Sequence, residues 1–294
     1  MPYKSETLLA YLNSFLEMLN PKNYILAIYR YYVTYRNFVE VLTHRVLNKF
    51  PMEAVLRNGE KITLENKIIA YYYTLYFKKL KHFKINDYFV EFEYNGKRVR
   101  LYGWKYGDPE SAFAFGDYDF LDVKDKIVVD IGASIGDTPI YFALRGASKV
   151  IAFEPFPKIF NLAKKNIEEN GFQDKIVLNN AGCGYDGKVR VREDLETDAG
   201  TQLINSGSGV EIPVYSLNTV VRKFNVKNAV LKVDCEGCEY ELFRTATNET
   251  LSKFNQILIE YHYGYKELIK RLTEAHFRVR YTIPKRTKRG MVLG

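Results

Sequence analysis

The segment Lys126–Pro155 constrains the fold of this chain more than any other. The apolar run Ile127–Val129 predicts a strand buried on both faces, and a second run, Val150–Phe153, follows a turn with two glycines and a short predicted helix. Glu154 ends the second run. A strand, a glycine turn, a helix and a second strand ending in an acid form the βαβ unit typical of nucleotide binding.

The residues of the turn indicate which ligand it would bind. Glycines let the backbone approach a ligand closely, and a dinucleotide turn places a pyrophosphate on the helix N-terminus. Acids on both sides of this turn would repel a pyrophosphate but suit a ligand that carries an amino group and a sulfonium. We therefore expect S-adenosylmethionine, with an ordinary parallel-sheet crossover as the alternative. The turn reads Asp130-x-Gly132-x-Ser134-x-Gly136-Asp137.

Hydrophobic patterning divides the rest of the chain into two regions. Residues 1–105 are expected to form a small N-terminal α+β region, in which Tyr24–Phe50 and Lys67–Phe83 have helical patterns and two Asn-Gly pairs predict β-hairpins. After Glu154, strand runs alternate with helical segments. This alternation predicts an α/β fold with a doubly wound, Rossmann-like, mostly parallel sheet over residues 106–294.

Composition and the irregular segments add weaker constraints. A net charge of +8 permits an anionic partner such as RNA, anionic lipid or a phosphorylated glycan. Three cysteines do not form a disulfide framework, and no secretory signal or membrane-spanning run is visible. We therefore expect a cytoplasmic location, with peripheral membrane contact by the tyrosine-rich N-terminal helices as an alternative to packing on their own domain.

The long Leu195–Gly209 stretch is expected to be a mobile lid.

Several segments together resemble the FkbM-type methyltransferases, a family with the class I S-adenosylmethionine-dependent fold. An ordered series of matches is more specific than a single glycine turn. The resemblance runs from about Phe115 to Leu293 and leaves the first third of the chain outside. The matching segments are Val129–Ala133 with Gly136, Ala152–Pro155, Asn166 and Asn170, Ser216–Asn218, Leu231–Glu239 and Ile259–His262.

The resemblance implies a cofactor site at the C-terminal ends of the strands. Glu154 would hold the ribose, the glycine turn would line the methionine and ribose, and Asn180 with Ala181 would lie beside the adenine. The expected cofactor-binding residues are Asp130, Gly132, Ala133, Ser134, Gly136, Asp137, Glu154, Pro155, Asn180, Ala181 and Asp234.

Four polar residues, Asp234, Glu236, Glu260 and His262, are expected to converge beside the sulfonium. Methyl transfer to a hydroxyl needs an in-line acceptor and a base within hydrogen-bond reach. His262 is the preferred base because its unperturbed pKa suits the task, with Asp234 or Glu236 acting directly or orienting it. Alternatively, Asp234 and Glu260 would hold Mg²⁺, which lowers the pKa of a bound hydroxyl.

The expected activity is therefore O-methylation of a hydroxyl on a sugar, glycan or other small metabolite. One alternative is an RNA methyltransferase, which would use the positive charge and the basic loop Lys285–Arg289, although no recognised RNA-binding module accompanies them. Another alternative is a non-catalytic S-adenosylmethionine-binding protein. The intact residues Asp130, Glu154 and Asp234 argue against it.

Cys235 and Cys238 form a CxxC motif that the family does not require. A disulfide, a redox pair, half a zinc site and two small residues at a crowded turn all remain open. Zinc would need two more ligands, and Cys183 is expected to be too distant to supply one.

Overall fold

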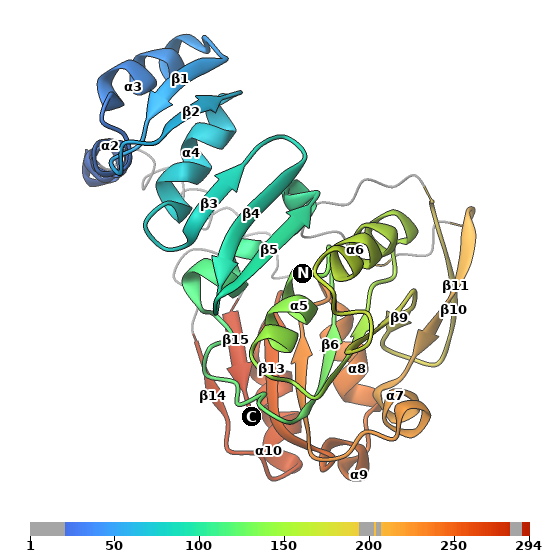
Figure 1. Ribbon diagram of the computed structural model, residues 1–294. Helices are drawn as coiled ribbons and strands as arrows, with labels where there is room; N and C mark the ends of the chain where they lie inside the picture. Colours follow the sequence, from blue (N-terminus) through green and yellow to red (C-terminus); the bar gives the residue numbers. More distant parts are fainter. Residues whose placement is uncertain (1–20, 194–202, 204–206, 283–289) are drawn as a thin grey trace. The chain divides into compact units, whose positions relative to one another are not determined.

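The computed structural model describes residues 21–193, 203, 207–282 and 290–294 (Figure 1). The chain divides between Val99 and Arg100 into two compact units. Most of the predicted lid, Leu195–Gly209, and the whole basic loop Lys285–Arg289 lie outside the described residues.

The N-terminal unit contains three helices and two small antiparallel sheets in its described part. The two predicted hairpins are confirmed, because β1 pairs with β2 and β4 is the neighbour of β5 in a three-stranded sheet. The elements are α2 (Pro21–Thr34), α3 (Phe38–Leu47), β1 (Met52–Val55), β2 (Lys61–Leu64), α4 (Lys67–Tyr76), β3 (Lys81–Ile85), β4 (Phe89–Tyr94) and β5 (Lys97–Tyr102).

Both helices predicted in this unit are wrong in extent. The Tyr24–Phe50 pattern is broken at Tyr35, which forms a β-bridge with Leu56 and leaves α2 and α3 as separate helices. The Lys67–Phe83 pattern ends with α4, and its last residues enter β3. Phe83 is buried there against Tyr73, at a ring-centroid distance of 5.1 Å, so tertiary packing outweighs the local helical pattern.

Large apolar side chains on α2 remain exposed, among them Ile25, Ile28 and Tyr29. None of the helices in the described part combines the length and the apolarity that crossing a bilayer requires. Peripheral membrane contact by this region therefore stays a prediction.

The C-terminal unit is built on a seven-stranded sheet with the order β14-β15-β13-β12-β6-β7-β8. The strands β13, β12, β6, β7 and β8 are parallel, whereas β15 runs antiparallel to both of its neighbours. The predicted doubly wound, mostly parallel sheet is confirmed. The strands are β6 (Ile127–Ile131), β7 (Lys149–Phe153), β8 (Ile176–Asn179), β12 (Ala229–Val233), β13 (Phe254–Tyr261), β14 (Arg280–Tyr281) and β15 (Gly290–Leu293).

Helices connect these strands and pack on them (Figure 1). Alternate residues of β6 and β12, such as Val129 and Leu231, share one core with α7, α8 and α10. The intervening residues, such as Asp130 and Lys232, point to the opposite face, where α5 packs on β6 and β7. The helical elements are η1 (Trp104–Tyr106), the π-helical η2 (Ser111–Phe115), α5 (Asp137–Leu144), α6 (Pro157–Glu169), α7 (Leu217–Phe224), α8 (Cys238–Thr245), α9 (Asn248–Leu251) and α10 (Lys266–Glu274).

A separate three-stranded sheet follows β8. It has the order β10-β11-β9, formed by β9 (Gly182–Cys183), β10 (Gly187–Val191) and β11 (Val210–Tyr215). In this sheet β10 pairs antiparallel with β11, and it does not pair with the main sheet.

Two asparagines on α6 hold the start of this unit in place. The side chain of Asn166 accepts a hydrogen bond from Tyr102 N (2.8 Å) and donates to Tyr102 O (3.0 Å) and Ile135 O (2.8 Å). One turn later, the side chain of Asn170 bonds Arg100 N (3.0 Å) and Arg100 O (2.7 Å) in the same way. The two amides thus satisfy backbone groups that a neighbouring strand would otherwise bond.

Replacing Asn166 by leucine should lower the free energy of unfolding by about 2–3 kcal/mol, because it leaves backbone groups of Tyr102 and Ile135 without partners. Urea unfolding at neutral pH measures the change. The matched control is Asn161→Leu on the exposed side of the same helix, expected within about 0.5 kcal/mol of wild type. Equal effects of the two substitutions would contradict this account.

Candidate functional site

The carboxyl ends of four neighbouring parallel strands bring the predicted polar residues to one edge of the sheet. Gly132 follows β6, Glu154 follows β7, Asp234 follows β12 and His262 follows β13. A cleft with about 870 Å³ of space, its open mouth included, lies at this edge. Its lining includes Tyr106, Asp108, Gly132, Ser134, Asp137, Glu154, Pro155, Phe156, Ala181, Lys232, Asp234 and Glu236.

A fully buried ion pair forms the floor of the cleft. Lys232 and Asp130 are cross-strand partners on β12 and β6, and Lys232 Nζ lies 3.0 Å from Asp130 Oδ1. The ammonium also donates to Gly132 O (2.8 Å), while Thr138 Oγ1 donates to Asp130 Oδ2 (2.6 Å). The pair therefore ties two strands, the glycine turn and the first turn of α5 together.

Burial and attraction oppose each other in this pair. Burial raises the pKa of Asp130, against the effect of the nearby Lys232 ammonium and the Thr138 hydroxyl. Burial also works to lower the pKa of Lys232, but Asp130 and Asp234 outweigh it, so the pKa of Lys232 is raised. Lys232 therefore stays a cation, and it holds the negative charge of Asp130 in place.

The glycine turn is compressed against the end of β12. Gly132 has φ +85°, and a Cβ added there would lie 1.7 Å from the carbonyl oxygen of Asp234. Only glycine fits this position, because both the backbone conformation and the space exclude a side chain. The turn therefore brings the end of β6, where the cofactor is expected to bind, next to Asp234.

Glu154 is positioned by the backbone around it. Its side chain is 5% exposed and accepts hydrogen bonds from Ser134 N (3.0 Å) and Phe156 N (2.9 Å). Asn180 donates to the carbonyl oxygens of Glu154 (2.9 Å) and Pro155 (3.0 Å) and so fixes the same loop. Burial raises the pKa of Glu154 to about 8, although the two amides favour its charged form.

The cleft is acidic overall. Burial raises the pKa of Asp137 to about 7, and it raises the pKa of Asp234 as well. Lys232 is the one Lys or Arg side chain among the described lining residues. A ligand with positive charge would favour the ionised form of these carboxyl groups and so oppose the effect of burial on their pKa values.

The predicted cofactor-binding residues fall into two groups. Gly132, Ser134, Asp137, Glu154, Pro155, Ala181 and Asp234 line the cleft. Asp130, Ala133, Gly136 and Asn180 lie behind that lining and support it.

No role in the site was predicted from the sequence for Tyr106, Asp108 and Lys232. Tyr106 and Asp108 reach the cleft from the connector before β6, and Asp108 accepts hydrogen bonds from Ser111 N and Oγ. No motif marks this connector. Lys232 was noted only as part of a family signature, although a lysine inside a buried strand run is a signal for a buried counter-charge.

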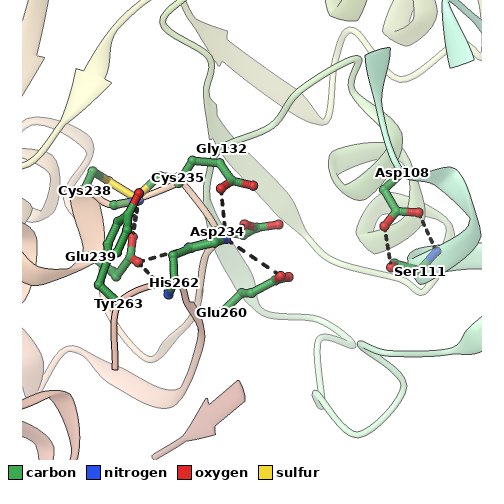
Figure 2. A network of polar contacts seen from close by, with 12 residues as sticks. Asp108, Ser111, Gly132, Asp234, Cys235, Cys238, Glu239, Glu260, His262 and Tyr263 are labelled. Atoms are coloured by element: carbon green, nitrogen blue, oxygen red, sulfur yellow. Dashed lines mark hydrogen bonds and ion pairs between the residues drawn. A yellow bond between two sulfur atoms is a disulfide. The ribbon is translucent and has the colours of Figure 1, made fainter. Parts of the chain in front are cut away.

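His262 lies at the centre of a second polar cluster, beside the cleft (Figure 2). It is 5% exposed, and its Nδ1 lies 3.0 Å from Oε1 of the fully buried Glu239. Its Nε2 lies 3.2 Å from Glu236 Oε2, 3.8 Å from Asp234 Oδ1 and 3.8 Å from Glu260 Oε1. The structure thus brings together the four predicted catalytic residues, and it adds Glu239, which was not among the residues predicted for the site.

The charge state of His262 follows from these neighbours. Burial favours the neutral imidazole, but the nearby carboxylates of Glu236 and Glu239 outweigh it and raise the pKa of His262 to about 10. In the chain without ligands, the imidazole is therefore a cation at neutral pH.

Cys235 and Cys238 are joined by a disulfide across the turn from β12 to α8 (Figure 2). Both sulfur atoms are therefore unavailable as thiolate ligands, which rules against zinc bound by this pair. Cys183 is a separate, buried free thiol. The turn that the disulfide closes contains Glu236, a non-glycine residue with φ +55°.

A family model described as the methyltransferase FkbM domain matches residues 130–286. Uncharacterized protein 158B of Sulfolobus islandicus rod-shaped virus 1 is 28% identical over 146 residues, 49% of this chain and 66% of that protein. Protein arginine N-methyltransferase 1 of Saccharomyces cerevisiae is 44% identical over 55 residues, 19% of this chain and 16% of that protein. The matches thus span less than two thirds of either relative.

Among solved structures, a ribosomal protein L11 methylase from Lactobacillus delbrueckii subsp. bulgaricus matches with 18% identity and a TM-score of 0.36. The match covers 60% of this chain and 72% of that chain.

Replacing Lys232 by methionine should lower the free energy of unfolding by about 3–5 kcal/mol, because it leaves the Asp130 carboxylate buried without its partner. The matched control is Lys188→Met, which breaks the exposed cross-strand pair of Lys188 and Glu211 (2.6 Å) and should cost at most about 1 kcal/mol. Denaturant unfolding measures both. The double variant Lys232→Met/Asp130→Leu should recover part of the loss, and no recovery would contradict a charge-based explanation.

The raised pKa of Glu154 predicts a pH-dependent stability. Between the ordinary glutamate pKa of 4.5 and about 8, the folded chain retains a proton on Glu154 that the unfolded chain has lost. The free energy of unfolding should therefore fall as pH rises through this range, with a slope of up to about 1.4 kcal/mol per pH unit from this group. Unfolding of wild type and Glu154→Gln from pH 5 to 9 isolates the contribution. Parallel pH profiles of the two proteins would refute it.

Proposed function

The chain belongs to the methyltransferase FkbM family, and from this premise we propose that it transfers the methyl group of S-adenosylmethionine to a hydroxyl group of a sugar, glycan or other small metabolite. The proposal rests on one observation: a single cleft is lined by Glu154, the carboxylate expected to bind the ribose hydroxyls, and by two further carboxylates, Asp234 and Glu236.

The cofactor half of the proposal rests on Glu154 and on the acidity of the cleft. Both oxygens of the Glu154 carboxylate are oriented by backbone amides, so ribose hydroxyls would meet an acceptor that is already positioned. The amino group and sulfonium of S-adenosylmethionine would supply the positive charge that the buried acids favour.

The acceptor half rests on a second cavity of about 790 Å³. Its lining shares Cys183, Leu203, Cys235, Glu236 and Cys238 with the first cleft, so the two cavities adjoin at the disulfide turn. Tyr185, Tyr263 and Glu241 also line it. Aromatic faces and carboxylate acceptors suit a polyhydroxylated molecule, because its C–H faces stack on rings and its hydroxyls donate hydrogen bonds.

The chemistry follows from the position of the carboxylates. The acceptor oxygen attacks the methyl carbon in line with the carbon–sulfur bond, which breaks and leaves its electron pair on sulfur. The hydroxyl proton passes to the carboxylate pair of Asp234 and Glu236, which faces the cleft. His262 does not line the cleft, so we propose that it supports these carboxylates and is not itself the base that the sequence favoured.

The same acidity argues against RNA as the acceptor. Asp234, Glu236 and Glu260 surround the proposed point of transfer, and a phosphodiester backbone would be repelled by them. A neutral acceptor carries no such penalty. RNA methylation is therefore the alternative that the experiment below must exclude.

The test is transfer of labelled methyl from S-adenosylmethionine to fractionated cell extract by the full chain. We expect label in nuclease-resistant, hydroxyl-rich small molecules or glycans, and loss of at least about 100-fold in rate with Asp234→Asn, because that variant removes a proton acceptor. The matched control is Asp174→Asn, at an exposed position away from the cleft, which should match wild type.

Two results would overturn the proposal. Label that disappears on nuclease treatment would identify RNA as the acceptor. Failure to bind S-adenosylmethionine in calorimetry, by a chain that unfolds cooperatively, would remove the methyltransferase function itself.

A further inference from the structure

We propose that Asp234, Glu236 and His262 bind a divalent first-row transition-metal ion, with Glu239 as the residue that positions the imidazole. The role of the ion in methyl transfer rests on the proposed function. Its binding does not, and it is measured separately.

The distances within the cluster suit a common ligand. One ligand atom from each of Asp234, Glu236 and His262 lies within 4.8 Å of the other two. Neighbouring ligand atoms around an ion with bonds of about 2.0–2.2 Å lie roughly 3–3.5 Å apart, and His262 Nε2 is 3.2 Å from Glu236 and 3.8 Å from Asp234. Glu260, at 3.8 Å from the same nitrogen, extends the set of oxygen ligands.

The environment of the buried nitrogen His262 Nε2 also supports a metal site. Nε2 is inaccessible to solvent and has no hydrogen-bond partner among the described residues. Glu236 lies close to it, but the contact lacks hydrogen-bond geometry and is electrostatic. A buried polar atom without a hydrogen bond is costly, and a metal–nitrogen bond would satisfy it.

Glu239 prepares the imidazole for such a bond. Its Oε1 lies 3.0 Å from His262 Nδ1 and also accepts from His262 N (3.2 Å), while its Oε2 accepts from Gly237 N (2.8 Å). A carboxylate on Nδ1 directs Nε2 toward the ion, fixes the ring and raises its basicity as a ligand.

The neighbouring residues restrain the same loop. The hydroxyl of Tyr240, next to Glu239 on α8, donates to Gly264 O (2.9 Å) and accepts from Tyr263 N (2.7 Å). The backbone at His262 and directly after it is therefore attached to α8, which restricts rotation of the imidazole away from Asp234 and Glu236.

The ligand set indicates the class of ion. Imidazole with carboxylates suits Mn²⁺, Fe²⁺, Co²⁺ or Zn²⁺, whereas Mg²⁺ prefers oxygen ligands and retains several waters. The site therefore differs from the Mg²⁺ site of Asp234 and Glu260 that the sequence suggested. Both Asp234 and Glu236 line the cleft, so the ion would touch an acceptor hydroxyl there and lower its pKa.

The test uses full-length protein stripped with EDTA and titrated with Mn²⁺, with free Mn²⁺ followed by electron paramagnetic resonance. We expect one ion bound per chain. His262→Gln and Asp234→Asn should each weaken binding at least about tenfold, because each removes one ligand. Thermal unfolding and calorimetry with S-adenosylmethionine identify any variant that has lost its fold or its cofactor site.

Two substitutions of Glu239, one conservative and one not, test its positioning role. Glu239→Gln keeps an oxygen for Nδ1 and should weaken Mn²⁺ binding about 10-fold, while Glu239→Leu should weaken it by up to about 100-fold. Glu249→Gln and Glu249→Leu, at an exposed position on α9, should leave binding unchanged.

The proposal is overturned if the folded chain binds no Mn²⁺, Co²⁺ or Zn²⁺ stoichiometrically, or if the His262→Gln variant binds as tightly as wild type. Mg²⁺ binding without binding of these ions would also overturn it, since imidazole would then have no role. In each case, S-adenosylmethionine binding and methyl transfer would still report on the proposed function independently.

Discussion

The rest of the C-terminal unit depends on the buried ion pair between Asp130 and Lys232. Removing two charges from water is expensive, and the cost is offset only where every partner is in place. Here the partners come from β6, β12, the glycine turn and α5, so the pair stabilises one register of the two central strands and one position of the turn. Gly132 can then approach Asp234 closely, and the cofactor and acceptor sides of the site come within reach of each other.

The same edge of the sheet gathers an unusual excess of acid. Glu154, Asp137, Asp234 and Glu236 line one cleft, and Glu239 and Glu260 stand beside it. Carboxyl groups at this density keep their negative charge only with cations among them. Lys232 supplies one positive charge at the floor of the cleft. His262 supplies a second beside the cleft. The proposed sulfonium and metal ion would supply the others, so in this account the site is completed by its ligands.

The sequence predicts the sheet well because buried parallel strands leave continuous apolar runs, as in Ile127–Val129 and Val150–Phe153, and their ends are marked by Gly132, Glu154 and Asp234. It fails where long-range contacts decide the outcome. Tyr35 leaves a helical pattern to bridge Leu56, and Phe83 joins a strand because Tyr73 packs on it. Asp108 and Glu239 reach the site through contacts that no local pattern encodes, and the raised pKa of His262 depends on carboxylates from two other elements.

The central claim is that this cleft binds the cofactor of a methyl-transfer reaction. A crystal structure of the chain with S-adenosylhomocysteine tests it most directly. We predict that the ribose hydroxyls donate to Glu154, that the adenine lies beside Ala181 and that the sulfur lies next to Asp234. Stoichiometric ligand bound elsewhere, with this cleft empty, would contradict the account.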